Sequence, residues 1–322
     1  MKVYLTFDIE IWCNNWEELD ARFPQSFHRY VYGKSAKGDY ALPKTLEILD
    51  EYGLKAVFFV EPMFAGRFGI ENLAVITKMI RDAGQDIQLH LHPEWTDEIR
   101  PLLFEGASVK RQHLSYYSFD EQCALLDYGR KIFSQVDCHA INAFRAGSFA
   151  CNRDTYRALQ RCRFQIDSSL NLVHPASGLD LRDCLNFYWP QKFHDITVFP
   201  MSIFQDGFGK PRPAQLGACS LSELRSALWS AFDNHVQHFV ILSHNFEMLK
   251  PGRSDPDPIV VKRFTGLCAF LAAERSAFDV SVFSAKEEIA DRSLVPHSNP
   301  IQVGVVDTLK RHGEQILRRL LA

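Results

Sequence analysis

Two pairs of residues in this chain have the types and the spacing of metal ligands. Asp8 and Glu10 are two positions apart, as are His90 and His92, and each pair stands at the end of a largely apolar run. Side chains two positions apart on a β-strand point to the same face, and two carboxylates there repel each other unless a cation or a proton lies between them. Carboxylate and two imidazoles form the ligand set of a catalytic zinc site with one position open for water. The spacing predicts a divalent metal site, with zinc as the first expectation and cobalt or nickel as alternatives. The competing interpretation of each histidine is a hydrogen-bonded core residue.

Two further residues suit a hydrolytic site. Arg145 ends an apolar run, and a buried arginine needs a carboxylate partner, for which Asp8 is the candidate. The alternative is a surface arginine at the end of a strand. His244 also ends an apolar run, where a group that titrates near neutral pH suits general acid–base catalysis. Its alternative role is structural, bonded to a loop carbonyl.

Polar residues follow other apolar runs as well. The carboxyl ends of parallel strands meet on one face of an α/β barrel, where catalytic residues sit. This position predicts roles in substrate contact or in support of the site for Glu61, Glu94, Asp167 and Asn245.

The elements that must position these residues alternate between strand and helix patterns. Almost continuous apolar runs indicate strands covered on both faces, hence a parallel sheet. The expected strands are Lys2–Asp8, Leu54–Val60, Asp86–His90, Ala140–Phe144, Phe164–Asp167, Ile196–Pro200, His238–Ser243 and Phe278–Phe283. The expected helices are Leu42–Tyr52, Ile70–Ala83, Phe119–Gln135, Arg153–Arg161, Leu221–His235 and Pro258–Glu274. About eight βα units predict an α/β fold with a closed or nearly closed barrel.

Local signals mark several element ends. Ser118 with Glu121, and Ser220 with Glu223, have the spacing of capping boxes at helix starts. Glycines follow two of the expected helices, as C-terminal caps do. Three long connections, expected to be irregular and functional, span residues 10–39, 93–118 and 168–194.

Composition excludes several classes of protein. With 36 Lys and Arg against 39 Asp and Glu, the net charge of −3 gives no basic surface for nucleic acid. No apolar run is long enough to span a membrane. The start, MKVYLTFDIEIW, is interrupted by acidic residues and cannot be a secretory signal, and eight cysteines without a C-x-x-C pair predict a reduced, cytoplasmic protein. Residues 303–322 predict a basic amphipathic helix whose stripe packs on the rest of the chain, with peripheral contact to an anionic membrane as the alternative.

Five motifs in order resemble the polysaccharide deacetylases with a NodB-type domain, the carbohydrate esterase family 4. They are TFDIE from Thr6, HLHP from His90, FRAG from Phe144, DSS from Asp167 and LSH from Leu242. The variants that the chain resembles most are those of lipopolysaccharide and capsule gene clusters. The resemblance implies a distorted (β/α)7–8 barrel, NodB-like, over residues 1–285 as a single domain, with a helical C-terminal extension over 286–322.

The resemblance also implies roles. Asp8 matches the catalytic base, Glu10 and His90 match metal ligands, Arg145 matches the arginine that orients the base, and His244 matches the general acid. Asp167 stands in the motif that lines the family's pocket.

Departures from the family pattern leave one ligand open. The usual second histidine, four positions after the first, is replaced by Glu94, so the third ligand is His92 or else Glu94. The usual Pro-Tyr after the arginine is replaced by glycine and serine, and the usual tryptophan of the pocket motif is absent.

The implied activity is metal-assisted hydrolysis of an N- or O-linked acyl group, such as acetyl, on a sugar, glycan or glycolipid precursor. Aromatic residues of the long loops, Trp12 and Tyr40 among them, are candidates to stack on sugar rings. The alternatives are a deacylase or amidohydrolase acting on a non-sugar amide, and a catalytically inactive carbohydrate-binding homologue.

Overall fold

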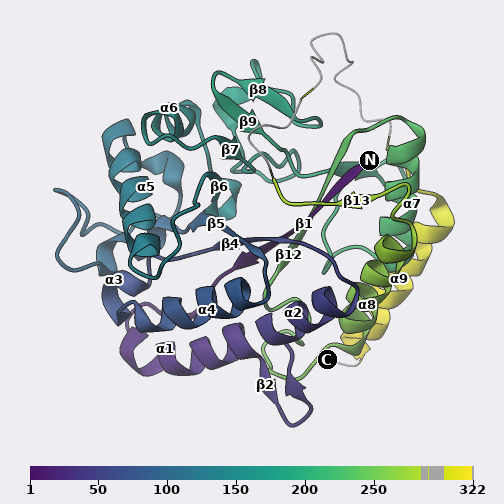
Figure 1. Cartoon of the computed structure of the whole chain (residues 1–322), viewed down its shortest axis with the longest axis horizontal. Helices are drawn as coiled ribbons and strands as arrows, with labels where there is room; N and C mark the ends of the chain where they lie inside the picture. The colour runs from purple at the N-terminus through teal and green to yellow at the C-terminus, as the bar shows by residue number, and fades with distance from the viewer. Residues whose placement is uncertain (284–288, 290–300, 321–322) are drawn as a thin grey trace. The chain divides into compact units, whose positions relative to one another are not determined.

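The computed structural model describes residues 1–283, 289 and 301–320 (Figure 1). The chain forms two units, and the first comprises Met1–Ala56, Ile203–Val282 and residues 301–320. The second comprises Val57–Ser202 together with Phe283. The predicted boundary between residues 285 and 286 lies outside the described residues.

The first unit is built around three parallel strands. Strand β1 (Lys2–Ile9) pairs with β12 (His238–His244) over its length and with β13 (Asp279–Val280) at its start. One face of β1 packs apolar side chains, and Phe7 meets the ring of Phe264 edge-on at 5.6 Å between centroids. The other face carries Tyr4, Thr6 and Asp8, because side chains alternate along a strand. The polar face of β1 thus leads directly to the candidate site residues.

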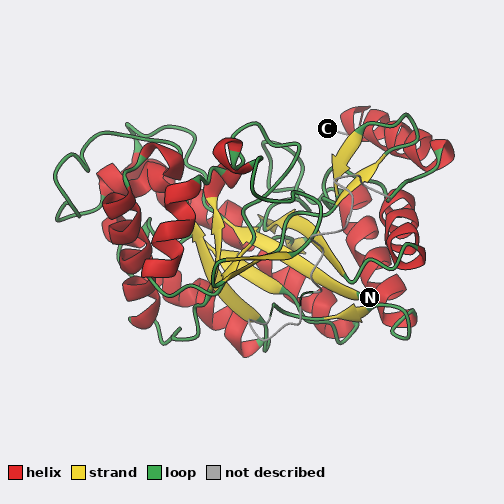
Figure 2. Cartoon of the chain, turned by 90° about the horizontal axis from the view of Figure 1, so that it is seen from above, coloured by secondary structure: helices red, strands yellow, loops and turns green. Residues whose placement is uncertain are grey.

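Helices and two short hairpins complete the first unit. The helices are α1 (Leu19–Phe27), α2 (Leu42–Glu51), α7 (Leu221–Asp233), α8 (Pro258–Ala273) and α9 (Val305–Leu320), with a π-helical turn at His28–Tyr32. The hairpins are β2 (Lys34–Ser35) with β3 (Gly38–Asp39), and β10 (Ile203–Gln205) with β11 (Pro211–Pro213). Figure 2 shows the helices in red, with α9 ending beside the C mark.

The second unit has a sheet of the order β4-β5-β6-β7-β9-β8. The strands are β4 (Val57–Val60), β5 (Asp86–Leu91), β6 (Ala143–Ala146), β7 (Ile166–Asp167), β9 (Ile196–Val198) and β8 (Gln191–Phe193). All of their pairings are parallel except that of β8 with β9. The helices are α3 (Ala65–Phe68), α4 (Glu71–Asp82), α5 (Phe119–Ser134) and α6 (Arg153–Arg161), with 3-10 turns at Pro93–Glu98, Leu114–Tyr116, Gly147–Phe149 and Leu179–Leu181.

The predicted alternation of parallel strands and helices is confirmed. Both predicted capping boxes form, since Ser118 and Ser220 accept hydrogen bonds from the backbone amides of Glu121 and Glu223. The connection over residues 10–39 is more regular than expected, because it contains α1, the π-helical turn and a hairpin. Proline inside α1 hides the helical pattern, but Leu19, Phe23 and Phe27 are buried at four-residue spacing, and this burial stabilises the helix.

The C-terminal helix is present as predicted, but it packs with the opposite face. Its polar side turns inward: Thr308 and Arg311 are buried, whereas Leu309 and Ile316 are 55% and 59% exposed. Sequence periodicity locates an apolar stripe but not the side that the stripe faces. In α9, charged contacts rather than apolar burial decide that orientation. In the described residues, no helix is long and apolar enough to cross a membrane.

The charged contacts that hold α9 are buried. Arg311 donates through Nε to Glu223 of α7 at 2.9 Å and through Nη2 to Asp206 at 3.2 Å. All three side chains are at most 5% exposed. Two buried carboxylates around one guanidinium are costly to separate from it, because each would remain charged in a poorly solvated place.

We predict that Arg311→Ala lowers the free energy of unfolding by about 3–5 kcal/mol, because the change leaves two buried carboxylates without their cation. The matched control is Lys310→Ala, one position earlier, where the side chain is 58% exposed and pairs with Asp307. That control should cost about 0–1 kcal/mol. Urea unfolding followed by circular dichroism measures both, and equal losses would contradict the role given to Arg311.

Candidate active site

Two carboxylates and an imidazole meet at the carboxyl ends of β1 and β12. The parallel register sets Asp8 beside His244. Asp8, Glu10 and His244 each offer a ligand atom within 4.8 Å of those of the other two. Asp8 and Glu10 are 2% and 5% exposed. Such a group can bind a cation or divide acid and base roles between its members.

Asn245 holds the backbone of Glu10. Its Oδ1 accepts from the Glu10 amide at 3.2 Å, and its Nδ2 donates to the Glu10 carbonyl at 3.1 Å and to the Tyr30 carbonyl at 2.5 Å. Its own amide donates to the Asp8 carbonyl at 3.2 Å. Asn245 is fully buried. Its side-chain amide both accepts from and donates to the Glu10 backbone, as a peptide group of a neighbouring strand would. Asn245 is therefore a positioning residue for the carboxylate of Glu10.

The Glu10 carboxylate has a fixed partner in Trp12. The indole Nε1 donates to Oε2 of Glu10 at 2.6 Å, and Trp12 itself is 45% exposed to solvent. A charge-assisted hydrogen bond of this length orients the carboxylate. Trp12 consequently links the site to the surface around it.

Glu247 holds His244 in its charged form. Its Oε1 accepts from His244 Nδ1 at 2.9 Å and from Gln215 at 2.7 Å, and its Oε2 accepts from Ser243 at 3.2 Å. Burial by itself lowers the pKa of His244, but the hydrogen bond to Glu247 and the charges of Glu10, Glu247 and Asp8 outweigh it and raise the pKa to about 9. At neutral pH the imidazole is therefore protonated and suits a proton donor.

A cleft of about 480 Å³ opens beside these residues within the first unit. Its wall includes aromatic rings of Trp12, Tyr30 and Phe246, the last stacked on His244 at 5.3 Å between centroids. Its volume lies in the range of small-molecule sites. Lys250 and Arg318 line this cleft and also line a neighbouring pocket of about 290 Å³.

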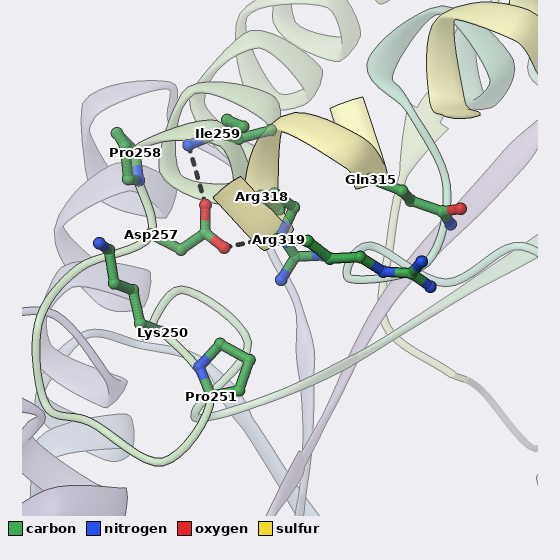
Figure 3. Close-up of a pocket in the computed structure, with 8 residues that line it drawn as sticks. All are labelled: Lys250, Pro251, Asp257, Pro258, Ile259, Gln315, Arg318 and Arg319. Atoms are coloured by element: carbon green, nitrogen blue, oxygen red, sulfur yellow. Dashed lines mark hydrogen bonds and ion pairs between the residues drawn. The ribbon is translucent and has the colours of Figure 1, made fainter. Parts of the chain in front are cut away.

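That neighbouring pocket lies at the start of α8 and is shown in Figure 3. Asp257 caps α8 by accepting from the Ile259 and Val260 amides, and it also pairs with Arg318 Nε at 2.7 Å. These contacts fix the guanidinium that borders both spaces. The cleft thus presents aromatic and cationic side chains, and two of its aromatic residues contact the site: Trp12 bonds to Glu10 and Phe246 stacks on His244.

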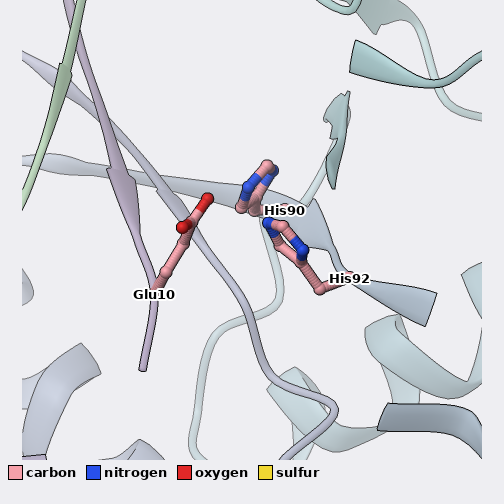
Figure 4. Close-up of side chains that lie close together, drawn as sticks. All are labelled: Glu10, His90 and His92. Atoms are coloured by element: carbon pink, nitrogen blue, oxygen red, sulfur yellow. The ribbon is translucent and has the colours of Figure 1, made fainter. Parts of the chain in front are cut away.

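The second unit presents two oriented histidines, drawn in Figure 4 together with Glu10 at the end of β1. His90 and His92 meet edge-on with ring centroids 4.7 Å apart. His90 Nδ1 lies 2.9 Å from the Arg145 carbonyl, and His92 Nδ1 lies 3.1 Å from Glu94 Oε1. A hydrogen bond from Nδ1 to a carbonyl or carboxylate places the ring's lone pair on Nε2, as in histidines that bind metals. The contact also gives Glu94 the position of an orienting partner for His92.

Gly147 is needed where it stands. A Cβ at this position would lie 2.8 Å from the Leu91 carbonyl and 2.9 Å from His92 Nδ1. Any larger residue would push the end of β5 and the imidazole away. The glycine that ends the FRAG motif therefore leaves room for the histidine motif of the neighbouring strand.

The DSS motif supports Arg145. This arginine is completely buried, lies 4.2 Å from the centroid of the Phe59 ring, and donates through Nε and Nη2 to the carbonyl and hydroxyl of Ser168, each at 3.1 Å. Asp167 accepts from Tyr156 at 2.7 Å and from both the amide and the hydroxyl of Ser169. Burial raises the pKa of Asp167, while its hydrogen bonds and the charge of Arg145 oppose that rise. The contacts make Asp167 an anchor of the loop after β7.

Glu61 and Tyr40 lie in local networks. Glu61 is buried and accepts from the Met63 amide at 2.7 Å; burial, partly opposed by the charge of His92, raises its pKa to about 8. Tyr40 follows the β2–β3 hairpin, where its amide donates to the Gly33 carbonyl and Lys44 Nζ lies 5.4 Å from its ring centroid.

The sequence did not indicate that Glu247 and the two serines of the DSS motif hold other site residues in place. Glu247 stands three residues after His244, so a histidine–carboxylate pairing at that spacing was available as a signal. Ser168 gave no signal of its own, because its contact with Arg145 is made across neighbouring strands by residues that are 23 positions apart.

The fold described above is that of the NodB-like polysaccharide deacetylases, carbohydrate esterase family 4, as the motif order predicted. A solved structure assigned as a polysaccharide deacetylase from Mycobacterium smegmatis matches 89% of this chain and 94% of its own, at 17% identity and a TM-score of 0.51. A family 4 carbohydrate esterase from Streptomyces lividans in complex with acetate matches 88% of this chain and 94% of its own, at 11% identity and a TM-score of 0.44.

A family 4 pseudoenzyme from Bacillus anthracis matches 86% of this chain and 62% of its own, at 14% identity and a TM-score of 0.41. Comparison with protein-family models found no match, and comparison with curated protein sequences found none. At these identities the likeness shows the fold alone, so any activity has to be inferred from the residues of the site.

We predict that Glu247→Gln lowers the pKa of His244 from about 9 toward its ordinary value of about 6.5. The neutral amide removes one negative charge and weakens the hydrogen bond to the imidazolium, so the proton leaves at lower pH. Histidine NMR titration of the metal-free protein measures the shift. Glu47→Gln, a change at an exposed glutamate, is the control, and an unchanged His244 titration in Glu247→Gln would refute this account.

Proposed function

We propose that this chain is a metal-dependent hydrolase that removes an N- or O-linked acyl group from a sugar. The observation that carries the proposal is the convergence of Asp8, Glu10 and a protonated His244 at the ends of two paired parallel strands. A carboxylate and an imidazolium in different environments suit the base and the acid of one reaction. The fold and the order of the motifs support the same activity.

The residues fit a divalent cation. Glu10 offers an oriented carboxylate, and His90 and His92 have their Nδ1 atoms bonded, which directs their Nε2 atoms to ligation. We assign these three as the ligands of a zinc ion, with cobalt or nickel as substitutes. Bound there, the cation would lower the pKa of water and polarise the acyl carbonyl.

The chain's own residues carry the proton transfers. Asp8 accepts a proton from the attacking water as the new carbon–oxygen bond forms at the acyl carbon. Arg145, fixed by Ser168, is the residue that we assign to orient Asp8, as its match to the family's arginine motif implies. His244 then donates its proton to the leaving amine or hydroxyl as the bond from the acyl carbon to that group breaks.

The cleft supports a sugar as the substrate. Trp12 and Phe246 offer rings to stack against, and Lys250 and Arg318 offer charge to an anionic group. We therefore propose an acylated sugar, glycan or glycolipid precursor. All eight cysteines are free thiols, which supports the proposal of a reducing, cytoplasmic location.

Metal titration tests the ligand set. We predict that the wild type binds one zinc ion, and that Glu10→Ala and His92→Ala lose this stoichiometric binding. Glu94→Gln should keep it with affinity lower by about 10–100-fold, because Glu94 orients a ligand rather than being one. Isothermal titration and metal analysis measure this, with Glu47→Gln as control. Retention of zinc by His92→Ala and its loss in Glu94→Gln would make Glu94 the third ligand.

An acetate-release assay tests the reaction. We predict that Asp8→Asn and His244→Gln each reduce release from acetylated sugars by about 10²–10⁴-fold, since each removes one proton-transfer group. His139→Gln, at an exposed histidine, is the control. Cyclic ureides run in parallel identify an amidohydrolase of non-sugar substrates. Zinc binding without turnover of any substrate would instead identify an inactive sugar-binding protein.

A further inference from the structure

Helix α9 exposes an apolar face that the rest of the described chain leaves uncovered. Six apolar residues on it are between 46% and 78% exposed: Val305, Val306, Leu309, Ile316, Leu317 and Leu320. At 100° per residue these side chains, with Gly313 among them, occupy one third of the helix circumference. Scattered apolar residues are ordinary on a surface, but a continuous stripe along a 16-residue helix marks an interaction site.

The opposite face of α9 is fixed and polar. Besides the buried Arg311, Thr308 accepts from the Gly207 amide at 2.8 Å, Glu314 pairs with Arg263 at 2.6 Å, and Arg318 pairs with Asp257. These contacts prevent the helix from rotating its apolar stripe inward. The outward stripe is therefore a property of the folded unit.

Cations flank the stripe on both edges. Lys310 lies on one edge and Arg319 on the other, and both are exposed. The acidic residues of α9 lie on the inward half, where Asp307 accepts from Ser226 at 2.7 Å and Glu314 binds Arg263. Along the described helix, the exposed border of the stripe thus carries positive charge.

This pattern identifies the occupant. A helix with an apolar face, cations along its edges and a polar back lies in the plane of a membrane interface, where lysine and arginine reach anionic head groups. The exposed ring of Phe208, 6.3 Å from that of His312, extends the apolar area beside the helix. Two copies of this face packed together would bring like charges from the two borders into one contact. We propose that the outward face of α9 binds an anionic lipid surface, a role that does not depend on the proposed hydrolase activity.

Vesicle co-sedimentation of the full chain tests this inference. The wild type should bind vesicles of phosphatidylcholine with phosphatidylglycerol, bind pure phosphatidylcholine vesicles less, and dissociate as salt rises. The double variant Leu309→Gln, Ile316→Gln should reduce partitioning by about tenfold or more, because it removes two side chains from the apolar stripe. Arg319→Glu should reduce binding to the anionic vesicles alone.

Matched controls separate the face from general surface effects. Leu179→Gln alters a leucine of the second unit that is 67% exposed, and Lys37→Glu alters an exposed lysine of the β2–β3 hairpin. Neither should change vesicle binding, and thermal melting should show that all variants fold, since the altered residues are exposed. Absence of wild-type binding would overturn the inference. So would a lipid-free dimer, seen by analytical ultracentrifugation, that Leu309→Gln, Ile316→Gln dissociates.

Discussion

The parallel register of β1 and β12 is the constraint on which the candidate site depends. It pairs Lys2 with His238 at one end and Asp8 with His244 at the other. The strands are almost continuously apolar, so burial on both faces fixes that register, and a slip by one residue would turn Asp8 to the opposite face. Core packing of the two strands thus makes neighbours of Asp8 and His244, which each lie six positions after the first pair of the register.

Glu10, His244 and Arg145 are each held by another polar side chain. Asn245 bonds to the backbone of Glu10, Glu247 accepts a hydrogen bond from His244 and favours its protonated form, and Ser168 accepts a hydrogen bond from Arg145. Buried polar groups are costly without partners, so these contacts both stabilise the fold and limit the geometry available for catalysis. The same principle orients α9, where buried ion pairs rather than apolar contacts decide which face turns outward.

The sequence predicted the alternating elements well, because long apolar runs and capping residues are local signals. Helix Arg153–Arg161 has the bounds expected for it, and both capping boxes form. Contacts between separate segments could not be predicted: nothing in the DSS motif at residues 167–169 indicated that Ser168 would bind Arg145. The orientation of α9 also escaped prediction, since the partners of its Arg311, Asp206 and Glu223, are 105 and 88 residues earlier in the chain.

The central proposal is that Glu10, His90 and His92 are the ligands of one catalytic metal ion. The orientation of each side chain supports it, through Trp12 at Glu10, a backbone carbonyl at His90 and Glu94 at His92. Anomalous diffraction at the zinc edge from crystals of the zinc-loaded protein tests it most directly. The account predicts one strong peak within bonding distance of the Glu10 carboxylate and of both histidine Nε2 atoms. No peak there, or a zinc ion held by other residues, would contradict it.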